Sequence, residues 1–274
     1  MKKDILVLLE KAYKTLKNVE ISLIEDSQKD IVTEGDLLLG NLIREECLKW
    51  DYPLCICTEE FNEGIQNSNT PKYFVFVDEL DGTDNAYRGI RIFPSVTLIQ
   101  IAKSNNPKNI YFEDFIAVGA VEHSHGEIYI AIKGEGIEKY RILDGSLEKL
   151  EIISKHPKQD VAITDVYSMM NEPEILNTIV STIQAKDFGS SAAAYCYVAE
   201  GSFEAYVSSH KKGHELPLLY MLCKESGLQV TDFAGRKYDK VKYDFNSKRY
   251  QIIAGIDSTS QKLISELKFF AKDM

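Results

Sequence analysis

The sequence has few of the features that mark disulfide-rich or zinc-binding proteins. Its five cysteines are an odd number and are scattered along the chain, so they form no disulfide framework. Cys55 and Cys57 lie two apart, but no second cysteine pair or spaced histidine pair accompanies them to complete a zinc set. Unpaired thiols are typical of a reducing compartment, so we expect a cytoplasmic protein.

Long apolar runs are also missing. The run from Ile5 to Leu9 is interrupted by charge after five residues, which is too short for the core of a signal peptide. No stretch approaches the length that crosses a bilayer. We therefore expect a protein with no membrane partner.

An excess of positive charge is the third missing feature. The chain carries 42 acidic and 32 basic residues, a formal net charge of −10. This balance, without a basic stripe or an aromatic platform, argues against a nucleic-acid partner. An anionic substrate would be repelled as well, unless bound divalent cations reverse the charge locally.

The composition that remains is that of a globular protein. The chain has 274 residues, of which 44% are hydrophobic, and this length buries a large core without disulfide support. We expect one domain over residues 1–274, made of an amino-terminal metal- and phosphate-binding half (about 1–155) and a carboxy-terminal α/β half (about 156–274).

Apolar periodicity predicts alternating strands and helices. Helices are expected over about residues 4–17 and from Thr33 onward, where Thr33 and Asp36 resemble a capping box. The other expected helices are 172–182, 191–200, 215–226 and 258–272, and the expected strands are 54–57, 73–77, 95–102, 115–121, 128–132, 161–164, 203–207 and 250–254. This order indicates a layered α/β or α+β architecture.

The strongest chemical signal lies in residues 78–85, Asp-Glu-Leu-Asp-Gly-Thr-Asp-Asn, directly after the strand predicted at 73–77. Acids at the end of a core strand lie where ligands collect in α/β sheets. The carboxylates of Asp78 and Asp81 can converge there on hard cations, and the Leu80 carbonyl is a neutral oxygen ligand. This part of the motif predicts a metal site.

The next part of the motif suits a phosphate group. Gly82 lets the backbone pass close to a ligand, and Thr83 can begin a short helix whose amides bind phosphate oxygens. The Thr83 hydroxyl can also orient a water molecule. The structural alternative is an Asp-Gly turn with a capping Asp or Thr, a common connection between strands.

Other acids have structural interpretations beside the functional ones. Glu59 is typical of a solvated strand end, and Asp36 is typical of a first-turn acid that complements a helix dipole. Glu215, in the first turn of a predicted helix, is favourable for the same reason. The segment from Gly189 to Gly201 either presents a helix start to a ligand or forms a tightly packed helix of small residues.

Taken together, the order and spacing of these pieces resembles the inositol monophosphatase family. That family belongs to a wider group of lithium-sensitive, magnesium-dependent phosphatases that includes fructose-1,6-bisphosphatase. The resemblance spans nearly the whole chain, and its Asp-x-x-Asp-Gly-Thr element is highly specific. The matching pieces are Asp30-x-Val32-Thr33-x-x-Asp36, Glu59-Glu60, Asp78-x-Leu80-Asp81-Gly82-Thr83-x-Asn85, Gly189-Ser190-Ser191-Ala192, Cys196-Tyr197-Val198-Ala199-Glu200-Gly201 and Glu225-Ser226-Gly227.

The resemblance implies a layered αβαβα sandwich, a homodimer, and a site for two or three Mg²⁺ ions. It assigns the first ion to Glu59, Asp78 and the Leu80 carbonyl, and the second to Asp78, Asp81 and Glu215. Glu59 would also help to hold a third, looser ion.

The same resemblance implies catalytic and substrate-binding roles. Thr83 and Glu59 would orient the attacking water, and Asp36 would steady that water network. The amides of Gly82 and Thr83 would hold the phosphate. The full set of expected substrate-binding residues is Asp81, Gly82, Thr83, Gly189, Ser190 and Ser191.

The chain departs from the family pattern near its last metal ligand. His214-Glu215 stands where Trp-Asp is usual, so that ligand is a longer carboxylate, as in the bisphosphatase branch. The acid that grips sugar hydroxyls in inositol-specific members falls at Ser208, which argues against an inositol phosphate substrate. Lys211 and Lys212 either meet a second phosphate or belong to a solvated loop.

These observations predict Mg²⁺-dependent hydrolysis of a small phosphorylated metabolite by a metal-activated water, of the inositol monophosphatase type. The alternatives within the same chemistry are a fructose-1,6-bisphosphatase and a 3′-phosphoadenosine nucleotide phosphatase. An alternative of another class is a catalytically silent regulator of the same fold. Acids at every expected metal position argue against that alternative.

Overall fold

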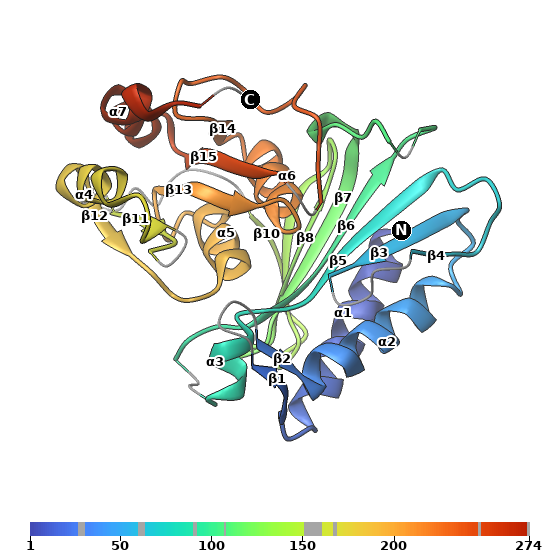
Figure 1. The fold of residues 1–274 in the computed structure, drawn as a ribbon. Coiled ribbons are helices and arrows are strands. Elements are labelled where there is room, and N and C mark those ends of the chain that lie inside the picture. Colours follow the sequence, from blue (N-terminus) through green and yellow to red (C-terminus); the bar gives the residue numbers. More distant parts are fainter. Residues whose placement is uncertain are drawn as a thin grey trace.

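The computed structural model describes residues 1–26, 31–59, 64–89, 92–106, 108–150, 161–166, 169–245 and 248–272. Its elements stack in five layers, in the order helices, sheet, helices, sheet, helices (Figure 1). The predicted αβαβα sandwich is therefore confirmed. Among the described residues, no helix combines the length and the apolar character needed to cross a bilayer.

The first layer consists of α1 (Lys2–Lys17) and α2 (Glu34–Cys47), which pack on one face of an eight-stranded sheet (Figure 1). The apolar residues of α1 recur at helical spacing, and they are buried against that sheet. α2 begins after Thr33, as predicted. Asp36 Oδ2 accepts hydrogen bonds from the Thr33 amide at 2.7 Å and from the Thr33 hydroxyl at 2.6 Å, which fixes the start of the helix.

The eight-stranded sheet is mixed. Among its described strands, only β3 and β5 pair in parallel, and the other neighbours are antiparallel. The strands, in spatial order, are β10 (Leu147–Leu150), β9 (Gly136–Arg141), β8 (Glu127–Ile132), β7 (Phe115–Glu122), β6 (Val96–Lys103), β5 (Tyr73–Asp81), β3 (Leu54–Thr58) and β4 (Ile65–Gln66). β5 is covered on both faces, as its lack of alternation predicted.

The middle layer contains α5 (Ser191–Ala199) and α6 (Leu216–Glu225), which lie between the two sheets (Figure 1). Both helices are apolar almost all round, which suits an element buried on both sides. Both were predicted, with ends that differ from the observed ones by at most one residue. Their side chains join the largest core cluster of the protein.

The second sheet has five strands and carries two helices on its outer face, α4 (Pro173–Thr182) and α7 (Asp257–Leu267). α7 is shorter than predicted, and a 3₁₀ turn at Lys268–Phe270 follows it. The strands in spatial order are β12 (Gln184–Lys186), β11 (Val161–Thr164), β13 (Ala205–Lys212), β15 (Arg249–Gly255) and β14 (Gln229–Thr231).

Several predictions on strands were incomplete. β13 continues to Lys212, five residues beyond the predicted end, because a register shift lets it stay paired with β15. The sequence did not predict the short strands β4, β9, β10, β12 and β14, nor the two-stranded pair of β1 (Leu23–Asp26) and β2 (Ile31–Thr33). Asp30, Glu60 and the boundary expected near residue 155 lie outside the described residues.

Candidate active site

Residues 78–81, the first half of the acidic motif, form the last part of β5, whereas the sequence placed the whole motif after the strand. β5 pairs with β6 through Asp78, opposite Leu98, and through Asp81, opposite Val96. Between these two pairs, two residues of β5 therefore face one of β6, which is a β-bulge. In a regular strand, residues three apart point to opposite faces, and the extra residue of the bulge allows Asp78 and Asp81 to join one cluster.

Gly82 turns the chain from β5 into α3 (Thr83–Tyr87), the short helix that the sequence predicted. Its φ of +78° is favourable only for glycine, and a Cβ here would lie 2.8 Å from the Pro94 carbonyl oxygen and 3.1 Å from the Ser190 Cβ. The close approach that requires glycine is therefore to the protein's own backbone. Contact of the Gly82 amide with a phosphate stays a prediction.

Four carboxylates predicted from separate stretches of the chain meet beyond this turn. Asp78, Asp81 and Glu215 each offer an oxygen within 4.8 Å of the other two. Glu59, Asp78 and His214 form a second group with the same spacing. The two groups share Asp78, so the structure brings together all four predicted carboxylate ligands.

Burial makes this cluster electrostatically unfavourable without cations. Asp78 and Glu215 are only 3% and 4% exposed. Burial, and then the charge of Glu59, holds the pKa of Asp78 well above its ordinary value. Burial, and then the charge of Glu215, raises the pKa of Asp81 to about 7. Hard oxygen donors that repel one another at this spacing are the environment in which proteins hold Mg²⁺.

The Thr83 hydroxyl lies between two oxygen acceptors. It donates to the Leu80 carbonyl at 2.6 Å, and Asp36 Oδ1 lies 3.3 Å away. Burial is the main cause that raises the pKa of Asp36. Asp36 therefore caps α2, which confirms its structural interpretation, and it also contacts the predicted water-orienting residue, whereas its role in a water network stays a prediction.

The start of α5 is occupied by one of the predicted metal ligands. Asp81 Oδ2 accepts hydrogen bonds from the Ser190 hydroxyl at 2.5 Å and from the Ala192 amide at 2.8 Å. The small residues of α5 pack tightly in the core, which confirms the packing interpretation of this segment, whereas contact of its start with a ligand stays a prediction. Gly189, Ser190 and Ser191 lie beside Asp81, and their contact with substrate stays a prediction.

Lys211 was not assigned to the carboxylate cluster by the sequence. Its Nζ lies 2.8 Å from Glu215 Oε2 and donates to Ser191 Oγ at 2.5 Å, and the residue is only 7% exposed. The solvated-loop interpretation of Lys211 is therefore wrong. Lys212 is partly exposed, and its Nζ lies 3.8 Å from Glu59 Oε1.

Two further residues near the cluster were missed. His214 is a member of the second donor group, and its position beside Glu215 was the signal for it. Gln100 links β6 to the start of α6: its amide donates to the His214 carbonyl at 2.5 Å, and its oxygen accepts from the Leu218 amide at 2.8 Å. A glutamine within the apolar run of β6 was the available signal, because a buried amide needs partners.

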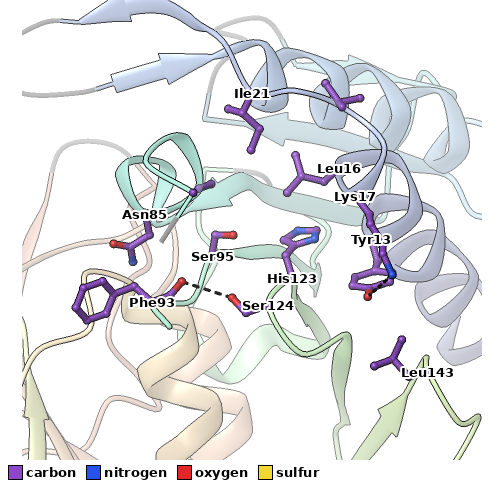
Figure 2. Close-up of a pocket in the computed structure, with 13 residues that line it drawn as sticks. Tyr13, Leu16, Lys17, Ile21, Asn85, Phe93, Ser95, His123, Ser124 and Leu143 are labelled. Carbon is purple, nitrogen blue, oxygen red and sulfur yellow. Dashed lines mark hydrogen bonds between the residues drawn. The ribbon is translucent and has the colours of Figure 1, made fainter. Parts of the chain in front are cut away.

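A separate cavity of about 630 Å³ lies between α1, α3 and the turn after β7 (Figure 2). Its described lining residues include Tyr13, Asn85 and His123 and none of the four carboxylates. The His123 ring stacks on Tyr13 with ring centroids 6.3 Å apart, and burial lowers the pKa of His123 to about 3. A histidine held neutral in this way is part of the packing.

A comparison with protein families identifies the family of this chain. Residues 2–269 match the model of the inositol monophosphatase family. The chain belongs to that family. This family membership agrees with the resemblance carried by the acidic motif.

Curated relatives and solved structures agree with the family assignment. The bifunctional NADP phosphatase/NAD kinase of Methanocaldococcus jannaschii is 27% identical over 188 residues, which cover 60% of this chain but only 32% of that protein. The Nus factor SuhB of Pasteurella multocida is 25% identical, over 83% of this chain and 80% of its own. The crystal structure of the extragenic suppressor protein suhB from Bartonella henselae shares the fold, with a TM-score of 0.76 and 20% identity over 97% of this chain and 98% of that one.

Proposed function

We propose that this inositol monophosphatase family member hydrolyses a small phosphate monoester with the help of Mg²⁺. The observation that supports the proposal best is the pair of overlapping donor groups, one of three carboxylates and one of two carboxylates with the His214 imidazole, which share Asp78 near the end of β5. A buried cluster of this kind is unfavourable for stability alone, because each added carboxylate repels the others. The electrostatic repulsion among these buried carboxylates is offset if divalent cations bind between them.

The donor set fits Mg²⁺ in kind and number. Glu59, Asp78 and the Leu80 carbonyl would hold one ion, and Asp78, Asp81 and Glu215 would hold another, with Glu59 assisting a third. All of these are hard oxygen ligands. When bound, Mg²⁺ supplies Lewis-acid chemistry, since it favours ionisation of water and neutralises phosphoryl oxygens.

The protein's own groups would position the attacking water and the ester. The single proton of the Thr83 hydroxyl is directed to the Leu80 carbonyl, with Asp36 as the nearby alternative. The oxygen of Thr83 is then able to accept a hydrogen bond from water and to orient it toward the phosphorus. Ser190 and the amide of Ala192 hold Asp81 in place, so that its second oxygen can serve the metal.

The substrate proposal extends beyond inositol phosphates. The position that carries a sugar-binding acid in inositol-specific members is Ser208 here, so the chain has no carboxylate at that point of β13. Ser208 is also fully buried. One relative is named as an NADP phosphatase, which acts on a phosphorylated nucleotide. A phosphonucleotide is therefore a second candidate substrate, beside the sugar bisphosphate that the sequence analysis also named as an alternative.

Phosphate release from a panel of esters, with Mg²⁺ and with a chelator, tests the proposal. The panel contains inositol 1-phosphate, fructose 1,6-bisphosphate, adenosine 3′,5′-bisphosphate and NADP⁺. We expect Mg²⁺-dependent release from at least one ester. A folded protein that releases phosphate from none of them would support the silent-regulator alternative.

Asp81→Asn supplies the residue-level test. We expect at least a hundredfold loss of kcat, about 2.7 kcal/mol of barrier, because the variant removes one predicted metal ligand. Asp84→Asn is the matched control: Asp84 belongs to the same motif, but its side chain is 50% exposed and paired with Arg88. A near-normal rate for Asp81→Asn would refute the assigned role.

A further inference from the structure

Lys211 has a polar environment that differs from that of a surface lysine. The register shift in β13 carries it to the cluster, where its Nζ contacts Ser191 Oγ at 2.5 Å and Glu215 Oε2 at 2.8 Å. Asp165 Oδ2 lies 3.7 Å away. Two of these oxygens lie within hydrogen-bond distance of the ammonium group, and the third lies only within ion-pair distance.

The contact with Glu215 conflicts with the proposed use of that residue. Glu215 belongs to the donor group with Asp78 and Asp81, whose ligand atoms lie within 4.8 Å of one another. An ammonium 2.8 Å from one of these oxygens and a divalent cation among all three would repel each other at short range. Lys211 is therefore a counter-cation of the metal-free cluster, and a metal ion bound there would displace it from Glu215.

A Lys211 displaced from Glu215 would keep only the more distant Asp165 carboxylate as a negative neighbour, and a buried charge so weakly paired favours an additional anionic partner. Its second neighbour, Ser191, is the first residue of α5 and is one of the predicted substrate-binding residues. Lys211 thus lies between the metal donors and a residue that is predicted to bind the substrate. An anionic group on the substrate would restore its pairing there.

We propose that Lys211 is a specificity-determining residue that binds an anionic group of the substrate other than the phosphoryl group being hydrolysed. The inference rests on the proposed phosphatase function and narrows its substrate to esters with a second negative group. Bisphosphorylated sugars and phosphonucleotides have this chemistry, whereas inositol monophosphate does not.

The chain supplies a matched control for Lys211. Lys139 is equally buried, at 7% exposure, and its Nζ lies 2.7 Å from both Glu127 and Glu200. Neither of these partners belongs to the predicted site. Lys139→Met therefore measures the effect of breaking a buried lysine pair, and Lys211→Arg keeps the charge at the site.

The first experiment measures metal binding without turnover. Mn²⁺ is titrated calorimetrically into the wild type, Lys211→Met, Lys211→Arg and Lys139→Met, each checked for folding by circular dichroism. We expect Lys211→Met to bind Mn²⁺ about tenfold more tightly than the wild type, because the competing charge is gone. Unchanged or weaker binding by Lys211→Met would overturn the counter-cation role.

The second experiment measures the substrate preference. Adenosine 2′,5′-bisphosphate and adenosine 2′-monophosphate differ only in the second phosphate, and kcat/KM is measured for each with Mg²⁺. We expect Lys211→Met to lose about tenfold or more on the bisphosphate and less than about threefold on the monophosphate. Lys211→Arg and Lys139→Met should keep the wild-type preference. Equal losses on both esters would show that Lys211 has no role in specificity.

Equilibrium binding of the same two nucleotides in Ca²⁺ separates this inference from the proposed function. If the wild type binds the nucleotides but hydrolyses neither, the phosphatase proposal fails. In that case the ratio of the two Kd values decides the role of Lys211. A smaller preference for the bisphosphate in Lys211→Met than in the wild type supports the inference, and an unchanged preference overturns it. Failure of the wild type to distinguish the two nucleotides, or to bind either, would overturn the inference.

Discussion

At the scale of single residues, the geometry of Thr83 allows a water-orienting role to be tested separately from a packing role. Its hydroxyl has one proton, 2.6 Å from the Leu80 carbonyl, and a second acceptor in Asp36 at 3.3 Å. The hydroxyl is therefore a donor to the protein and is able to accept from water. Its removal should affect the chemical step more than folding or metal binding.

Thr83→Val replaces the hydroxyl with a methyl group of similar size, whereas Thr83→Ser keeps the hydroxyl. We expect Thr83→Val to lower kcat by about tenfold to a thousandfold, in the range for loss of a group that positions a reactant. Thr83→Ser should stay within about threefold of the wild type. Steady-state kinetics at saturating Mg²⁺ measures both, and an equal loss in the two variants would point to packing.

At the scale of elements, the turn from β5 into α3 determines where the motif points. Gly82 has a φ of +78°, and a Cβ there would press on the Pro94 carbonyl oxygen at 2.8 Å. Gly89 also has a positive φ, +63°, but a Cβ there would meet nothing within 4 Å. A comparison of substitutions at the two glycines therefore separates the energetic cost of backbone strain from that of steric contact.

Gly89→Ala should lower the free energy of unfolding by about 1–2 kcal/mol, the cost of a left-handed non-glycine residue. Gly82→Ala should lower it by about 2–5 kcal/mol, because overpacking adds to that strain. Urea unfolding followed by circular dichroism measures both variants. Equal destabilisation of the two would mean that the turn relaxes away from Pro94.

At the scale of the whole molecule, the carboxylate cluster couples stability to pH and to metal. Burial raises the pKa of Asp81 from 3.8 to about 7. The folded protein therefore binds more protons than the unfolded chain between these values. The stability that Asp81 contributes is full below about pH 4 and is lost as pH rises through about 7.

We expect Mg²⁺ to raise Tm more at pH 8 than at pH 6, because the ion takes the place of a proton in the cluster. The metal-free protein should also lose Tm relative to Asp81→Asn over this interval. Thermal melts in Mg²⁺ and in chelator at both pH values measure the effect. An Mg²⁺ increment that is independent of pH would contradict a proton–metal exchange at Asp81.

The local chemistry of this protein can be inferred from its sequence. The helices of the middle layer and the capping of α2 follow from short-range patterns in which neighbouring residues decide the outcome. The carboxylates were identified because Asp-x-x-Asp-Gly-Thr and the distant acids occur in a specific order. The fold class followed from the same order of strands and helices.

Only the tertiary structure decided which groups meet and on which face they lie. The bulge that brings Asp78 and Asp81 together depends on pairing between β5 and β6, and neither strand determines it alone. The burial of Lys211 against Glu215 depends on another register shift, between β13 and β15. This shift decides whether Lys211 lies in the cluster or in solvent. Register is set by contacts between strands that are distant along the chain, and a sequence pattern specifies the residues of a strand without specifying the partner residue opposite each one.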